Sequence, residues 1–316
     1  MASTTKVMTA LLAIERGNLQ DRVVCSENAF GVSGTSIYLQ LGETLTLEEM
    51  LLGLMLSSGN DAAVAIAEHI GGTHDGFVEM MNARAREIGA MNTHFANPHG
   101  LPDDGHYTTA YDLALIAREA MENETFRRIV STKRANIPWE GRTYKRQLNN
   151  KNKLLSVYEG ATGVKTGFTS KAGRCLVFGA RREGLELIGS VLGCSDWFDE
   201  AARLMDACYE TYDMARVLAP AMSAGQMPVT NGKKDVCSMC VMEEMSVPLS
   251  SGEQAQIVLD VPKSVPAPVY PGMHLGTAKL VADGRVYARS EVVAGERVDA
   301  NGIHLDVRRI MACWIL

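Results

Sequence analysis

The sequence predicts an α+β protein in which a helical region with short strands precedes a small all-β region. Apolar residues recur at helical spacing through much of the first two thirds of the 316 residues. Between residues 214 and 298 that period fades, and valines, prolines and short alternating runs replace it. A chain of this length also exceeds one average domain. We therefore expect one domain over 1–213, a smaller β-rich domain over 214–298 and a tail over 299–316.

The helices expected in the first region combine an apolar face with a signal for a start or a stop. A threonine followed three residues later by an acidic residue is typical of a helix N-terminus, and glycine often ends a helix. The expected segments are 4–16, which ends at Gly17, the run after Thr46 and Glu49, the segment 76–88, and the run after Thr109 and Asp112.

Strand signals appear near the end of the first region and throughout the second. The segment 174–192 contains two apolar runs separated by the polar turn 182–184, which predicts two buried strands. The segment 279–288 contains Asp283-Gly284 between apolar runs, and this dipeptide is a strong signal for a β-hairpin.

The composition excludes several classes of protein. Apolar residues make up 46% and charged residues 22%, values that exclude a disordered or collagen-like chain. The formal net charge of −6 argues against a nucleic-acid partner. The seven cysteines are scattered and odd in number, so they predict no disulfide framework. Cys237 and Cys240 lack a second cysteine pair, so we expect neither a metal site nor a cofactor.

Three short motifs carry residues able to do chemistry. Ser3 and Lys6 are three apart on the first predicted helix and share a face, so the amine can reach the hydroxyl. Ser58-Gly59-Asn60 interrupts an apolar helical stretch, where unsatisfied buried polar groups cost about 1–3 kcal/mol each. Taken singly, each pattern also fits a helix cap, with Asn60 capping a new helix in the second case.

The third motif, Lys165-Thr166-Gly167, lies in a strand pattern with glycines where another backbone must come close. Alone it also fits a turn at a strand edge. Ser-x-x-Lys, Ser-Gly-Asn and Lys-Thr-Gly in this order, on helix, loop and strand, are far less probable together than any one of them.

In these motifs the chain resembles the serine-type D-alanyl-D-alanine carboxypeptidases, the low-molecular-weight penicillin-binding proteins. The region 214–298 is similar to the C-terminal domain that many of them carry. The resemblance implies a penicillin-binding/β-lactamase-like domain, in which an antiparallel sheet packs with a helical cluster, followed by a small all-β domain. The segments that carry the likeness are 2–10, 56–63, 97–101, 106–112 and 163–173.

The resemblance implies a serine carboxypeptidase that removes the terminal D-alanine from peptidoglycan pentapeptide stems and is inhibited covalently by β-lactams. Ser3 would attack the carbonyl group of the penultimate D-alanine and form an acyl-enzyme. Lys6 would take the proton from Ser3, and Ser58 would relay a proton to the leaving amine. A free lysine, with a pKa of ~10.4, is almost fully charged at pH 7. We therefore expect burial and the nearby charge of Lys165 to lower the pKa of Lys6.

The remaining assignments concern substrate binding. Asn60 would hydrogen-bond the amide of the substrate, and Lys165 with Thr166 would hold its terminal carboxylate. Gly167 would let the substrate strand lie close, and the backbone N–H groups of Ser3 and Phe168 would bind the oxyanion. An arginine helps to bind the carboxylate in several relatives, but the segment 194–198 offers none, and Arg203 is the nearest candidate.

The two ends of the sequence predict where the protein acts. Members of the family carry a signal peptide, an opening helix and strands ahead of the nucleophile's helix, and none of these precedes Ser3. We therefore expect the natural product to be longer, and a chain that starts at Met1 to be weakly active or unstable. We expect the mature protein outside the cytoplasmic membrane. The apolar segment 303–316, with two arginines and a tryptophan, either associates with a membrane surface or packs on its own domain.

Two other functions remain as alternatives. A β-lactamase or esterase could use the same scaffold, although no acidic residue with the Glu-x-x-x-Asn spacing is evident for rapid deacylation. A non-catalytic peptidoglycan-binding protein of the envelope is the other alternative, and the intact motif residues argue against it. His99 and His106 lie in segments that we interpret as structural.

Overall fold

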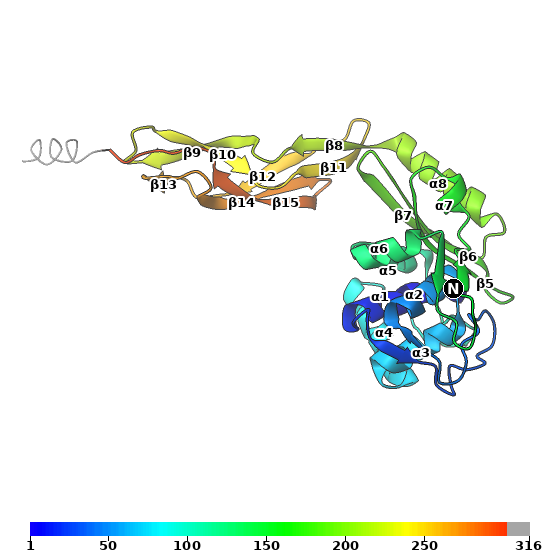
Figure 1. Ribbon diagram of the computed structural model, residues 1–316. Coiled ribbons are helices and arrows are strands. Elements are labelled where there is room, and N and C mark those ends of the chain that lie inside the picture. The colour runs from blue at the N-terminus through cyan, green and yellow to red at the C-terminus, as the bar shows by residue number, and fades with distance from the viewer. Residues whose placement is uncertain (302–316) are drawn as a thin grey trace, which may run out of the picture. The chain divides into compact units, whose positions relative to one another are not determined.

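The computed structural model describes residues 1–301 and divides the chain into two compact units, the first being Met1–Cys208 and the second beginning at Tyr209 (Figure 1). The boundary predicted after residue 213 falls within strand β8 (Tyr212–Leu218). The predicted segment 303–316 lies outside the described residues. Across residues 1–301, every helix is too short or too polar to cross a membrane.

The first unit contains most of the helices and three separate small sheets. Its helical elements are the 3₁₀ turn η1 (Ala2–Thr5), α1 (Lys6–Arg16), α2 (Leu47–Leu56), α3 (Asn60–Gly71), α4 (His74–Ile88), α5 (Ala110–Met121), α6 (Glu124–Ser131), α7 (Leu154–Val157) and α8 (Trp197–Thr211), of which residues 209–211 belong to the second unit. Its strands are β1 (Arg22–Val24), β2 (Thr44–Thr46), β3 (Arg134–Ile137), β4 (Arg146–Asn149), β5 (Ala161–Thr169), β6 (Gly173–Arg182) and β7 (Leu185–Val191).

Local sequence signals account for where several helices begin and end. Thr46 and Glu49 form both hydrogen bonds of the predicted capping box at the start of α2. Thr109 accepts a hydrogen bond from the backbone N–H of Asp112 at the start of α5, as expected. The first predicted helix ends before Gly17, and its opening turn is η1 rather than α-helix. The capping predictions are therefore confirmed.

Helix α1 forms the centre of the first unit. Residues 6–13 of this helix are all buried, and α1 packs against α2, α3 and α5. Burial on every side is expected of a helix that is apolar around most of its circumference. The surrounding helices contribute the large fully buried side chains of Phe77 and Phe126. This packing fixes η1, which continues directly into α1, at the end of the core.

Strands β5, β6 and β7 form an antiparallel sheet in chain order, with the polar turn between β6 and β7 that the sequence predicts. Figure 1 shows the helical cluster α1 to α6 on one face of this sheet and α8 on the other. Thr166 pairs with Leu176, and Phe168 pairs with Arg174. Because paired residues share a face and neighbours alternate, Lys165 faces the helices while Thr166, Phe168 and Arg174 face the side of α8.

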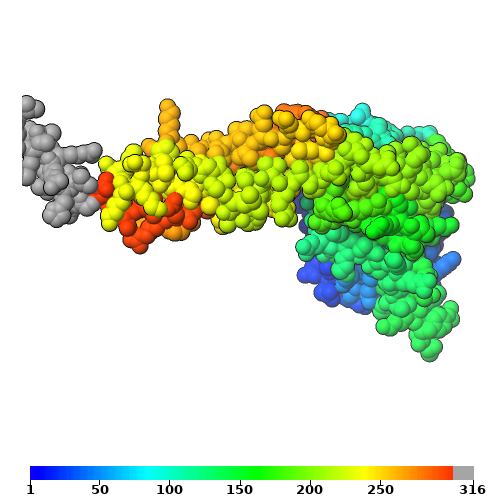
Figure 2. Space-filling view, turned by 90° about the horizontal axis from the view of Figure 1, so that it is seen from above, coloured from blue at the N-terminus to red at the C-terminus, as the bar shows by residue number. Residues whose placement is uncertain are grey.

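From Tyr212 to residue 301 the second unit contains strands and no helix, as the sequence predicts. A sheet with the strand order β12-β14-β15-β10-β9-β13 lies beside the β8–β11 pair, and in Figure 2 the residues of this unit, coloured yellow-green to red, form a continuous packed body. Asp283 and Gly284 both have positive φ, which suits the tight turn of the predicted hairpin. The further strands are β9 (Ser223–Thr230), β10 (Val236–Val241), β11 (Met245–Ser250), β12 (Gln256–Asp260), β13 (Val265–Pro266), β14 (His274–Ala282) and β15 (Arg285–Ala294).

Candidate active site

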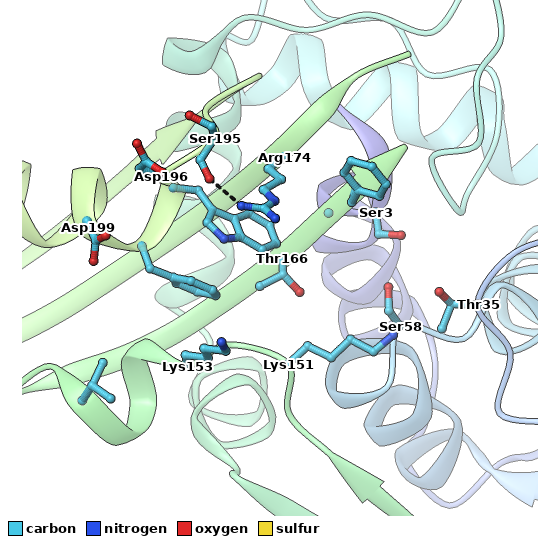
Figure 3. Close-up of a pocket in the computed structure, with 15 residues that line it drawn as sticks. Ser3, Thr35, Ser58, Lys151, Lys153, Thr166, Arg174, Ser195, Asp196 and Asp199 are labelled. Carbon is cyan, nitrogen blue, oxygen red and sulfur yellow. Dashed lines mark hydrogen bonds between the residues drawn. The ribbon is translucent and has the colours of Figure 1, made fainter. Parts of the chain in front are cut away.

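A cleft of about 710 Å³ opens in the first unit beside strand β5 (Figure 3). Residues from distant parts of the chain line it, and they include Ser3, Ser58, Thr166, Gly167 and Phe168 of the three sequence motifs. Its other walls come from Thr35, from the segment before and within α7, from Arg174 on β6 and from residues 195–199. The cleft thus brings together segments that only tertiary packing can join.

Ser3 and Lys6 form the innermost contact of this cleft. Ser3 lies on η1 and is partly exposed to the cleft, whereas the side chain of Lys6, the first residue of α1, is fully buried. The Nζ atom of Lys6 lies 3.0 Å from Oγ of Ser3, 2.7 Å from Oδ1 of Asn60 and 2.6 Å from the carbonyl oxygen of His99. The turn of η1 into α1 therefore places the two predicted residues within hydrogen-bond distance.

The surroundings of Lys6 disfavour its charged form. Burial holds its pKa well below the ordinary value, the positive charges of Lys165 and Lys151 lower it further, and Asp61 opposes the shift. A neutral amine has two N–H donors and one lone pair. Asn60 Oδ1 and the carbonyl of His99 can only accept, so the two N–H groups donate to them. The lone pair is then left for the hydroxyl proton of Ser3, as a general base requires.

The Ser58-Gly59-Asn60 motif joins α2 to α3. Ser58 has a φ of 67° and is nearly buried, and in Figure 3 its hydroxyl points toward Ser3 across the cleft. Asn60 begins α3, with Gly59 rather than Asn60 in the capping position. Its Nδ2 donates to the carbonyl oxygen of Ser33 at 2.6 Å, which fixes Oδ1 toward Lys6. The motif thus positions one hydroxyl at the cleft and one amide behind it.

Asp61 anchors the loop that forms one wall of the site. Its buried carboxylate accepts hydrogen bonds from Oγ of Ser36 at 2.6 Å, from the backbone N–H of Ile37 at 3.1 Å and from that of Leu39 at 3.0 Å. The same loop supplies Thr35 to the cleft and the carbonyl that holds Asn60. No local pattern in the sequence marks Asp61, because its partners are 22 to 25 residues away.

Strand β5 supplies the third motif. Lys165 is buried on the helical face of the sheet, where its Nζ donates to the carbonyl oxygen of Thr166 at 2.9 Å, and it does not line the cleft. Burial and the charge of Lys151 lower the pKa of Lys165 to about 7. A Cβ atom on Gly167 would lie 2.8 Å from the backbone nitrogen of Ser3. A backbone does come close at this glycine, as the sequence predicts, and it is that of η1, whereas the approach of a substrate strand stays a prediction.

The two histidines singled out in the sequence support η1 from behind. Nε2 of His106 lies 2.8 Å from Oγ1 of Thr5, and Nδ1 accepts the backbone N–H of Ala96. Burial lowers the pKa of His106 to about 4 and that of His99 to about 3, so both rings are neutral. Neither histidine lines the cleft, which agrees with the structural interpretation of their segments.

The predicted site residues thus fall into two layers. Ser3, Ser58, Thr166, Gly167 and Phe168 line the cleft, whereas Lys6, Asn60 and Lys165 lie buried behind it. Within residues 1–301, no three His, Cys, Asp or Glu side chains group closely enough to hold a metal ion.

Three basic residues that line the cleft were missed, namely Lys151, Lys153 and Arg174. Lys151 approaches Ser58 with its amine in Figure 3, and burial lowers its pKa. No local pattern marks this lysine in the sequence. Arg174 could have been found, because the β5–β6 hairpin register places it opposite Phe168.

A hydroxyl held against a buried, uncharged amine at the floor of a cleft is typical of serine acyl-transfer enzymes. Comparison with known proteins agrees with this class. Residues 1–196 match the family described as D-alanyl-D-alanine carboxypeptidase. The D-alanyl-D-alanine carboxypeptidase DacF of Bacillus subtilis is 35% identical over 99% of this chain and 83% of its own length. The chain therefore belongs to the D-alanyl-D-alanine carboxypeptidase family of serine peptidases.

Solved structures give the same result for the fold. Penicillin-binding protein 5 from Haemophilus influenzae superposes with a TM-score of 0.69 at 28% identity, covering 94% of this chain and 90% of that one. A peptidoglycan synthesis regulatory factor, PBP3 from Streptococcus pneumoniae, superposes with a TM-score of 0.79 at 25% identity, covering 95% and 92%. The penicillin-binding fold that the sequence predicts, followed by a sheet domain, is confirmed.

Proposed function

We propose that this enzyme releases the terminal D-alanine from peptidoglycan stem peptides ending in D-Ala-D-Ala, through an acyl-enzyme on Ser3. The observation that carries the proposal is the 3.0 Å contact between Ser3 Oγ and the fully buried amine of Lys6. An uncharged lysine at this distance can accept the hydroxyl proton as the oxygen attacks.

In the acylation step, Ser3 Oγ forms a bond to the carbonyl carbon of the penultimate D-alanine while Lys6 takes the hydroxyl proton. The oxyanion that develops is stabilised by the backbone N–H groups of Ser3 and Phe168, on the two segments that meet at Gly167. The tetrahedral intermediate then collapses and the peptide bond breaks. Ser58 gives its hydroxyl proton to the departing amine and takes the proton held by Lys6 in its place, which leaves Lys6 neutral again. The products are free D-alanine and an ester on Ser3.

In the deacylation step, a water molecule attacks the ester carbonyl and gives a proton to Lys6. The ester bond breaks, the shortened stem peptide leaves as a carboxylic acid, and the proton returns to Ser3. A β-lactam enters the same reaction when Ser3 opens its ring. Its leaving amine stays covalently attached and blocks the path of water, so the adduct persists.

The substrate would lie along the free edge of β5. Thr166 presents its side chain to the cleft, and Lys165 adds positive charge from behind the strand for the terminal carboxylate. Asn60 holds Lys6 from behind the cleft, and a contact with the substrate amide would fall to the second N–H of its Nδ2, since the first donates to Ser33. Since peptidoglycan lies outside the cytoplasmic membrane, we place the mature protein there. A membrane association of segment 303–316 is proposed from its sequence alone.

The test is release of D-alanine from a diacylated L-Lys-D-Ala-D-Ala tripeptide, measured alongside covalent labelling by a fluorescent penicillin. We expect wild-type protein to do both, Ser3→Ala to do neither, and Lys6→Met to lose at least about 10³-fold in acylation rate. Mass spectrometry should place the penicillin adduct on Ser3. Labelling without D-alanine release would contradict the proposal, and rapid turnover of the adduct would identify a β-lactamase instead.

A further inference from the structure

We propose that Arg174 binds the C-terminal carboxylate of the substrate and so makes the enzyme selective for peptides with a free C-terminus. The inference rests on the proposed function, because it concerns the group that the leaving D-alanine carries. It assigns to strand β6 a binding residue that none of the three sequence motifs contains.

The position of Arg174 in the sheet brings its side chain to Thr166. Arg174 pairs with Phe168 across the β5–β6 hairpin, and Thr166 occupies the diagonal position two residues along β5. Diagonal neighbours on one face of an antiparallel pair lie about 7–8 Å apart at their backbones, within reach of a long side chain. Arg174 and Thr166 both line the cleft, and Figure 3 shows them projecting into it from neighbouring strands. The guanidinium and the Thr166 hydroxyl can therefore bind one carboxylate together.

Arg174 also brings a permanent positive charge to the cleft. The two lysines behind the cleft, Lys6 and Lys165, are buried and lose their protons more readily than a free lysine. An arginine remains charged at any physiological pH. The base Lys6 must be uncharged for catalysis, whereas the substrate carboxylate needs a positive charge to bind it. A cation that stays charged at the same pH meets the second need without affecting the first. Arg174 supplies that cation at the mouth of the cleft.

Arg174 is held in place by its neighbours and still has N–H groups free to donate. Its Nη1 donates to the carbonyl oxygen of Ser195 at 2.7 Å, and its guanidinium lies 5.9 Å from the ring centre of Trp197. Asp196 and Asp199 line the same wall, but in the part of the chain that the structure describes no carboxylate lies within 4.0 Å of Arg174. The other N–H groups of the guanidinium can therefore donate to a carboxylate in the bidentate geometry that arginine favours.

Arg203, the candidate that the sequence offers, does not fit this role. Its side chain is exposed, it makes a two-pronged ion pair with Glu200 at 2.6 and 2.9 Å, and it does not line the cleft. Arg203 is therefore a matched control, since it is an arginine of the same unit that is already paired outside the cleft.

The test compares two substrates that deliver the same acyl group. One is the diacylated L-Lys-D-Ala-D-Ala tripeptide with its free carboxylate, and the other is the methyl thioester of diacylated L-Lys-D-Ala, whose leaving group is uncharged. For Arg174→Gln we expect kcat/KM on the tripeptide to fall by roughly 10- to 100-fold, the range for losing a charge-assisted hydrogen bond. On the thioester we expect a change of less than about twofold, because no carboxylate is bound there.

Two further variants complete the design. Arg174→Lys keeps the positive charge but cannot make the bidentate hydrogen bonds of a guanidinium. Its kcat/KM on the tripeptide should therefore lie between those of wild type and Arg174→Gln. Arg203→Gln should behave as wild type on both substrates. Equal losses on both substrates in Arg174→Gln would overturn the inference, since they would show that Arg174 only supports residues 195–199. Unchanged tripeptide hydrolysis would overturn it too. Wild-type protein that cleaves only the thioester would instead refute the proposed function, and this role of Arg174 with it.

Discussion

Adding a methyl group at Gly167 would press strand β5 against the turn that carries Ser3. The Cβ atom of an alanine at this position would lie 2.8 Å from the backbone nitrogen of Ser3, 2.9 Å from that of Thr4 and 3.2 Å from Cβ of Ala2. The two closest atoms belong to backbone and cannot rotate away. The added atom therefore has to move η1 and β5 apart.

The size of that movement follows from the contact distances. To restore an ordinary separation of 3.4 Å, the two backbones must part by about 0.6 Å. Catalytic groups need positioning within about 0.5 Å, and a misplacement of about 1 Å can cost ~10²-fold in rate. We therefore expect acylation of Gly167→Ala to be roughly 10- to 100-fold slower than that of wild type.

The cost in stability should be much smaller. Overpacking of this kind typically costs about 1–3 kcal/mol, and replacing glycine at an ordinary φ recovers about 0.4–1 kcal/mol through the unfolded chain. For a domain of this size the net loss corresponds to a fall in melting temperature of roughly 2–8 °C. The variant should thus remain folded at 25 °C while its nucleophile is displaced.

Stopped-flow measurement of labelling by a fluorescent penicillin gives the acylation rate, and thermal unfolding gives the stability. Gly105→Ala is the matched control, because its Cβ would meet no atom closer than 3.4 Å, and we expect it to label at the wild-type rate. A folded Gly167→Ala protein that acylates as fast as wild type would refute the reasoning, since the close approach would then not determine the position of Ser3.

Three further predictions concern pH and buried charge. The plot of kcat/KM for D-alanine release against pH should be bell-shaped. Acid protonates the base Lys6, and alkali removes the charge of Lys165, whose pKa is about 7. A flat profile from pH ~5 to ~9 would contradict this. Asp61→Asn should lower the free energy of unfolding by about 2–3 kcal/mol in urea denaturation, because the carboxylate anchors loop 36–39; an unchanged midpoint would show that the loop needs no anchor. Arg146→Met should cost about 3–5 kcal/mol by leaving the fully buried Glu43 unpaired. The double variant with Glu43→Gln should recover most of that loss in the free energy of unfolding. An Arg146→Met variant as stable as wild type would disprove the pairing argument.

Features encoded in neighbouring residues were predicted well. The capping box at Thr46, the end of α1 before Gly17 and the hairpin at Asp283-Gly284 each depend on groups a few residues apart. The spacing of Ser3 and Lys6 is of the same kind, since one helical turn brings residues three apart together. The order of the three motifs then indicated the family, and the comparisons confirm it.

Residues that act through distant partners were not predicted. Lys151 reaches the cleft from a loop without a local pattern, and Asp61 binds backbone groups more than twenty residues earlier in the chain. Arg174 enters the cleft through the pairing register of the β5–β6 hairpin, which no single motif in the sequence encodes. Asn60 was expected as a helix cap in one interpretation, whereas Gly59 takes that position and Asn60 turns toward Lys6.

The sequence by itself determined which chemical groups are available and which of them are held close by a single turn of backbone. Only the tertiary structure decided their protonation states and their access to a substrate. The pKa of a lysine depends on how much water surrounds it and on which charges lie within a few ångströms, and both are set by packing between distant segments. Burial beneath α3 and β5 makes Lys6 a base, and the pairing of β5 with β6 brings a permanent positive charge to the mouth of the same cleft.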